Sequence, residues 1–188
     1  MYDRDLYKKV EQFVISSFNK SGQSHQIKHF LRTAYWIKEL KPNADDVILI
    51  AAVAHDIERA FRLDDVKNSK KTLSFLDLKF LRPHEERGAE IICSFLRDNN
   101  ADIKLTGRVR NFVSRHEEGG DADQNLLKDA DSISFFENNV SQFLTKQKKE
   151  VGKEKVKQKF DWMFERITSQ RAKKIAQPWY EDAVARLD

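Results

Sequence analysis

The segment 47–56 constrains the fold of this chain more than any other part of the sequence. Eight apolar residues in a row, Val47 to Ala54, lead directly into His55 and Asp56. A helix over this segment has no polar face, so other elements of the protein must surround it. An imidazole and a carboxylate at the end of a buried helix are costly unless they are paired or bind a metal. The rest of the chain is therefore expected to supply partners for His55 and Asp56.

Helical periodicity dominates the remaining sequence. Apolar residues recur at spacings of three and four, and no strand-like alternation is long enough to indicate a sheet. The 188 residues include only six glycines and three prolines, which leaves few breaks. We therefore expect a single all-α domain, folded as a compact helical bundle. Helices are predicted over 3–19, 24–40, 83–98 and 126–136, and over a stretch that includes Val109 to His116. A further helix is predicted from an N-cap at Asn43 to about Phe61. The segment from about Ser141 to Asp188 is predicted to form a charged helical hairpin.

The region 64–98 is predicted to contain a helix that begins at Pro83 and, before it, a loop or lid. Pro83 is predicted to begin its helix, because proline lacks the backbone N–H that later helical positions need. The preceding segment, Asp64–Leu81, is polar and then mixed. We interpret it as a loop or lid with a short helix near Leu73–Leu78.

Three histidines lie on helix faces that should point inward. His55 shares a face with apolar residues, and His84 and His116 each stand at one end of an apolar stripe. A single such histidine is most often a core residue with one hydrogen bond. Three of them on different helices, together with Asp56 and Asp131 at apolar faces, form a set suited to divalent metals. Imidazole and carboxylate favour Mn, Fe, Co, Ni or Zn over Ca.

The spacing of the central pair also suits a metal. Adjacent helical residues point about 100° apart, so His55 and Asp56 can reach one ion, and Asp56 can bridge to a second. The single cysteine, Cys93, lies in an apolar helical stretch and is interpreted as a small core residue, so no disulfide framework is expected.

Three motifs resemble those of the HD-domain superfamily of metal-dependent phosphohydrolases. They are the segment 24–32 (SHQIKHFLR), the His55-Asp56 pair, and the segment 129–131 (DAD), in that order. The resemblance covers residues 20–140 and implies a single HD domain over 1–188, with a C-terminal helical extension over 141–188. It also implies that the first metal is held by His29, His55, Asp56 and Asp131.

The resemblance implies a second metal site as well. Two-metal members carry two further histidines, which His84 and His116 match in order, with Asp56 bridging the ions. Some of these members have paired histidines at the position of His116, whereas this chain continues with Glu117. One or two ions, of Mn, Fe, Co, Ni, Zn or Mg, are therefore both compatible with the pattern.

Hydrolysis of a phosphate ester or anhydride is the activity that the resemblance implies. Metal ions would lower the pKa of a bound water and neutralise phosphoryl oxygens, and a general acid would protonate the leaving group. Glu58 is the carboxylate nearest in sequence to the central pair, although it also fits an ordinary solvent-facing glutamate. Arg59 should share the face of His55 and Asp56. The predicted catalytic residues are Asp56, Glu58 and Arg59.

Binding of a phosphorylated substrate also needs cations beyond the metal. Arg32 lies one turn after His29, and His25 lies one turn before it, while Lys70 and Lys71 lie in the predicted lid. Each of these side chains also fits a surface charge or a local ion pair. The predicted substrate-binding residues are His25, Arg32 and Arg59.

The charge pattern favours a small phosphorylated substrate over a macromolecule. The net charge is +4, and the lysine-rich stretch 146–159 is interleaved with Glu150 and Glu154 and lacks an aromatic platform. It is best interpreted as a solvated helix face, so nucleic acid is disfavoured as a partner. No apolar run is long enough to span a bilayer and no signal peptide is recognisable, so we expect a cytoplasmic protein that does not bind membranes. The sequence carries no signal for the oligomeric state.

Two other functions fit the same residues. HD-like proteins such as myo-inositol oxygenase use a similar His/Asp set to hold two irons and activate O₂, and both His84 and His116 are present for such a site. A non-catalytic module that senses a nucleotide is the third interpretation. The complete ligand set argues against that module, because binding without catalysis does not require every ligand.

Overall fold

The chain folds into helices, and the residues that the structure describes contain no strand. The structure is a computed structural model that describes residues 4–62 and 78–187. The all-α prediction is therefore confirmed for this part of the chain. The helices are α1 Arg4–Lys20, η1 Ser24–Gln26, α2 Ile27–Leu40, α3 Asp46–Ala54, α4 Glu58–Phe61, α6 Leu78–Asp98, α7 Ile103–Val113, α8 Ala122–Asn138, α9 Val140–Gln142, η2 Phe143–Gln147, α10 Lys148–Val151, α11 Lys153–Glu165 and α12 Gln170–Ala185.

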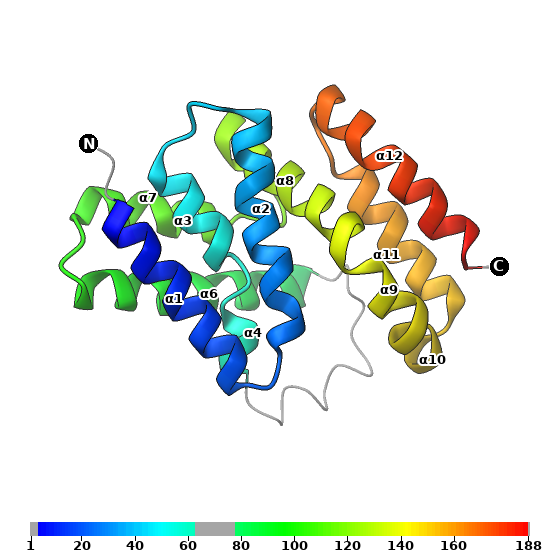
Figure 1. Ribbon diagram of the computed structural model, residues 1–188, viewed down its shortest axis with the longest axis horizontal. Coiled ribbons are helices and arrows are strands. Elements are labelled where there is room, and N and C mark those ends of the chain that lie inside the picture. Colours follow the sequence, from blue (N-terminus) through cyan, green and yellow to red (C-terminus); the bar gives the residue numbers. More distant parts are fainter. Residues whose placement is uncertain (1–3, 63–77, 188) are drawn as a thin grey trace.

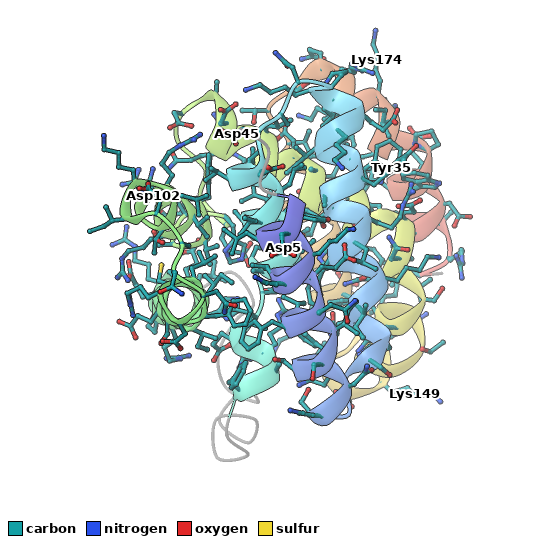
Figure 2. All side chains as sticks on the ribbon, turned by 60° about the vertical axis from the view of Figure 1, so that its left-hand side comes forward. Asp5, Tyr35, Asp45, Asp102, Lys149 and Lys174 are labelled. Atoms are coloured by element: carbon teal, nitrogen blue, oxygen red, sulfur yellow. The ribbon has the colours of Figure 1, made fainter. Side chains whose placement is uncertain are left out.

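Helix α3 is the buried centre of the first half of the molecule. Every residue of α3 is buried, as its apolar sequence predicts. It packs against α1, α2, α7 and α8. Figure 2 views α6 and α7 nearly end-on; α7 packs against both α3 and α6. The N-cap of α3 is Asp45, whose carboxylate accepts a hydrogen bond from the Ile48 N–H (3.2 Å), and not the predicted Asn43.

Two hydrophobic cores meet along α8. Leu127 and Ala130 belong to the core around α3, whereas Ile133 and Phe136 belong to a second core with α11 and α12. Figure 1 shows α8 running between the helices of the two cores. Polar residues at the boundary are consequently buried, and α8 can present them to either side.

The helix over the central pair differs from the prediction. We expected one helix from Asn43 to about Phe61, but α3 ends at Ala54 and a turn separates it from the short helix α4. In this turn the imidazole Nδ1 of His55 hydrogen-bonds to the carbonyl of Ala52 (2.8 Å). That bond occupies a carbonyl which would otherwise be left without a partner at a helix end. His55 and Asp56 thus lie between the two helices, and both side chains are buried.

Three other boundaries differ from the predictions. Pro83 lies inside α6, which already begins at Leu78. His116 lies beyond the end of α7 at Val113, in the following turn. The C-terminal segment is a hairpin only over α11 and α12. It is preceded by short helices and by a break at Gly152, whose φ of 90° is a backbone conformation suited to glycine.

The predicted lid falls largely outside the described residues. Lys70, Lys71 and the short helix predicted near Leu73–Leu78 lie there, and only residues 78–81 of the lid segment are described, as the start of α6. Among the helices that the structure describes, none is long and apolar enough to cross a membrane.

Candidate metal centre

The six residues predicted as metal ligands lie together in one buried site. They come from α2, α6, α8 and the two turns that follow α3 and α7. Their ligand atoms form two groups, and within each group the atoms lie within 4.8 Å of one another. The exposed fractions of these residues are all small: His29 3%, His55 1%, Asp56 5%, His84 2%, His116 1% and Asp131 6%.

The first group consists of His29, His55 and Asp131. Asp131 Oδ1 lies 3.1 Å from His29 Nε2 and 3.5 Å from His55 Nε2. Two donor atoms bound to one ion at about 2.1 Å lie about 3.0–3.4 Å apart in octahedral or tetrahedral geometry. The spacing of this group therefore fits side chains that share an ion.

The second group consists of Asp56, His84 and His116. Asp56 Oδ1 lies 2.7 Å from His84 Nε2 and 3.7 Å from His116 Nε2. The other carboxylate oxygen of Asp56, Oδ2, lies 3.9 Å from His55 Nε2 in the first group. Asp56 is thus the residue that connects the two groups, as a bridging ligand requires.

Two of the imidazoles are held by the chain immediately before them. The Nδ1–H of His55 donates to the Ala52 carbonyl and that of His116 donates to the Val113 carbonyl, each at 2.8 Å. A carbonyl only accepts, so Nδ1 carries the proton in both rings. The Nε2 atoms of both rings are buried and have no hydrogen-bond partner among the described residues. Such an unpaired group costs about 1–3 kcal/mol, and a bound cation would remove that cost.

The other two imidazoles are oriented by distant residues. The Ser134 hydroxyl donates to the His29 carbonyl (2.7 Å), so its oxygen accepts the Nδ1–H of the His29 ring (3.0 Å). The His84 Nδ1 donates to Glu58 Oε2 at 2.7 Å. All four rings consequently present Nε2 to the centre. Side chains and carbonyls behind metal-binding histidines orient ligands in this way.

The protonation of the rings follows from their surroundings. Burial alone would lower the pKa of His55, but the carboxylates of Asp131 and Asp56 outweigh burial and raise it to about 9. Burial lowers the pKa of His116 to about 4, and the neighbouring rings of His55 and His84 add to this effect. His116 is therefore neutral near pH 7, with a lone pair on Nε2 that faces the other rings. The donor set of imidazole and carboxylate fits a divalent metal on these grounds.

Glu58 does not fit the predicted role of general acid. Its carboxylate is bound by His84 Nδ1 and by the guanidinium groups of Arg62 and Arg87. Burial would raise the pKa of Glu58, but these partners hold it well below its usual range. A group that donates a proton near neutral pH needs a pKa near that pH. The contacts instead suit a residue that orients His84, so the expectation of a solvent-facing glutamate also fails.

Arg59 lies at the site as predicted, whereas Arg32 and His25 do not. The Nε of Arg59 lies 2.8 Å from Asp56 Oδ2. The guanidinium of Arg32 pairs with Glu137 (2.7 Å), which is the local ion pair considered as its alternative. His25 is exposed in η1. The three residues 25, 29 and 32 do follow one another by a helical turn, but only His29 points into the centre.

Several residues of the site were not predicted from the sequence. The guanidinium of Arg166, just after α11, contacts the carboxylates of Asp131 and Glu117. The side chain of Lys159 is also close enough for its charge to interact with those carboxylates. In the sequence, Ser134 is weakly indicated as a site residue, because it is a small polar residue within an apolar stripe. Arg166 is indicated as weakly, since it follows the buried Met163 by one helical turn.

Comparison with known proteins agrees with this architecture. The crystal structure of a predicted HD superfamily hydrolase from an uncultured Thermotogales bacterium superimposes with a TM-score of 0.58 and 21% sequence identity, covering 95% of this chain and 87% of that one. The resemblance to the HD superfamily is thereby confirmed for the fold. No curated protein matches the chain. Residues 12–185 match a family described as a domain of unknown function, DUF4202. The chain belongs to the DUF4202 family, and it shares the fold of this predicted HD superfamily hydrolase.

Proposed function

We propose that this protein is a metal-dependent phosphohydrolase that cleaves a phosphate ester or anhydride of a small molecule, such as a nucleotide or a related metabolite. The observation that carries the proposal is the pair of buried Nε2 atoms on His55 and His116 without hydrogen-bond partners among the described residues. They face two carboxylates that are themselves buried. Imidazole nitrogens that face buried carboxylates in this way are suited to bind a divalent cation.

In this proposal some residues would hold the metal ions and others would orient those ligands. His29, His55 and Asp131 would hold one divalent ion, and His84 and His116 a second, with Asp56 between them. When bound, such ions supply a hydroxide near neutral pH and neutralise phosphoryl oxygens. Ser134 and Glu58 orient two of the rings, and Arg59 places a positive charge beside Asp56. Burial of the site excludes bulk water and strengthens each of these electrostatic contacts.

A second function, oxygen activation by two irons, is favoured by the position of Asp56 between the two ligand groups. One experiment separates the two. Metal analysis of the purified protein is followed by a phosphate-release screen across nucleotides and sugar phosphates with Mn or Co, with oxygen uptake recorded in parallel. Phosphate release without oxygen uptake supports the hydrolase. Iron content with oxygen uptake, and no phosphate release from any substrate, contradicts it.

A further inference from the structure

Arg166 reaches the metal centre from the C-terminal hairpin. The residue follows α11 directly, and only 6% of its side chain is exposed. Its guanidinium contacts Asp131 Oδ2 and Glu117 Oε2, and its Nε donates to Ser132 Oγ (2.8 Å). One face of the guanidinium lies 4.6 Å from the ring centre of Trp162. Each terminal nitrogen has one partner among the described residues, which leaves it a second N–H.

Asp129 fixes the place of the hairpin. The buried carboxylate of Asp129 accepts hydrogen bonds from Thr168 N (2.8 Å), Thr168 Oγ1 (2.9 Å) and Ser169 N (2.8 Å), in the turn between α11 and α12. These donors lie two and three residues after Arg166. The contact thus joins the turn that carries Arg166 to the same helix that carries Asp131. It does so without touching a candidate metal ligand.

With its imidazoles neutral, as metal binding requires, the centre carries equal numbers of interacting carboxylates and cations. The carboxylates of Asp56, Glu117 and Asp131 interact with three cations, which are Arg59, Lys159 and Arg166. One divalent ion would leave this buried set with two excess positive charges, and two ions would leave four. A metal-bound hydroxide would offset one of these charges, and the low-dielectric site favours an anion that offsets the rest. A phosphoryl group carries the required charge, and a guanidinium matches its geometry with paired N–H donors.

From these contacts we infer that Arg166, together with Arg59 and Lys159, forms an anion subsite for the phosphoryl group, and that Asp129 is its positioning residue. This inference rests on the proposed function, because the anion is the phosphoryl group of that substrate. The C-terminal hairpin then contributes directly to the anion subsite, since the segment 141–188 supplies two of the three cations of that subsite. A metal reduces the pull of Asp131 and Glu117 on Arg166, so its N–H groups become available to the anion.

Binding of inorganic phosphate to the full chain tests the inference directly. The manganese-loaded protein is titrated with phosphate by calorimetry, and manganese content is measured for each variant. Arg166→Gln is expected to weaken phosphate binding about 10–100-fold while the manganese stays bound. Arg166→Lys keeps the charge but loses the paired donors, so its phosphate affinity should lie between those of the wild type and Arg166→Gln. The matched control is Arg171→Gln, which removes the same charge from an exposed position on α12 and should change nothing.

Asp129→Ala provides a second route that leaves the guanidinium intact. The variant should keep its manganese but weaken phosphate binding severalfold, because Arg166 loses its fixed position. A purely structural role of Asp129 would lower the melting temperature without changing phosphate affinity in the folded protein. If Arg166→Gln does not fold, Arg166→Lys and Asp129→Ala decide the question. Phosphate affinity within twofold of wild type in these variants overturns the inference.

Three further outcomes distinguish the anion subsite from a structural role of Arg166 and from the proposed function. Loss of phosphate binding in strict proportion to loss of manganese would mean that Arg166 only steadies Asp131, and this also overturns the inference. If the wild-type protein binds phosphate through Arg166 but hydrolyses no phosphorylated compound, the anion subsite stands and the proposed hydrolase fails. If Arg166→Gln hydrolyses the substrate with an unchanged KM, the hydrolase stands and the anion subsite fails.

Discussion

Replacing Ser134 by alanine removes one oxygen atom, yet it should weaken metal binding in the first ligand group. The Ser134 hydroxyl is the acceptor for the Nδ1–H of His29, at 3.0 Å, and both residues are buried. Without it, the ring must either leave a buried N–H unpaired or move the proton to Nε2, where it blocks the lone pair. Either result works against an ion on His29.

The size of the effect follows from the contact that is lost. An unpaired buried donor costs about 1–3 kcal/mol, and loss of a contact behind a metal-binding histidine reduces affinity by roughly 10–100-fold. Since 1.4 kcal/mol corresponds to tenfold, the two ranges overlap at about 1.4–2.7 kcal/mol. We therefore expect the dissociation constant of the first ion to rise by one to two orders of magnitude in Ser134→Ala. Competition with a chromophoric chelator under Zn or Mn measures this constant.

Thr33→Val is a matched control for this experiment. The Thr33 hydroxyl donates to the same His29 carbonyl (2.9 Å) that Ser134 does, but it does not touch the imidazole. Its loss should lower the free energy of unfolding by about 1 kcal/mol and leave metal affinity unchanged. Equal metal affinity in Ser134→Ala and the wild type, with one ion bound per first group, would refute the assigned role of His29 Nδ1–H.

Three more predictions concern the same centre. His55→Ala and Asp56→Ala should each abolish metal retention and phosphatase activity while helical circular dichroism survives; full activity in either variant would contradict the site. Metal at about 100 times its dissociation constant should stabilise the protein by about 2.7 kcal/mol, and chelator should lower the melting temperature by about 5–11 °C. Glu58→Gln should raise the dissociation constant of the ion bound by His84 about tenfold. A fall in kcat with full metal content would instead support the predicted role of Glu58 as the general acid.

The candidate ligands could be placed from the sequence because their signal is local and periodic. An imidazole at the end of an apolar stripe marks the inner face of a helix, and this sufficed for His84 and His116. The break after Ala54 was not predictable in the same way. No glycine or proline interrupts the segment 55–61, and at the turn His55 bonds back to Ala52 and faces partners from distant helices.

Charged residues of the site were harder to assign. Arg32 and Arg59 have the same kind of spacing to a candidate ligand, yet the first pairs with Glu137 and the second with Asp56. Glu137 follows the DAD motif by more than a turn, so only the docking of α2 on α8 brings it to Arg32. Arg166 lies beyond the segment that carries the motifs, and its role depends on the turn that Asp129 fixes.

The two ways of holding the imidazoles have a consequence for the order of folding. His55 and His116 are oriented by carbonyls three residues earlier, so any chain that forms these turns already presents both rings. His29 depends on a partner 105 positions away. Contacts of such long sequence separation form late, after loop closure has been accomplished. During refolding, an ion can bind through His29 only after α2 has docked on α8. The rate of metal binding would therefore report the rate of that docking step.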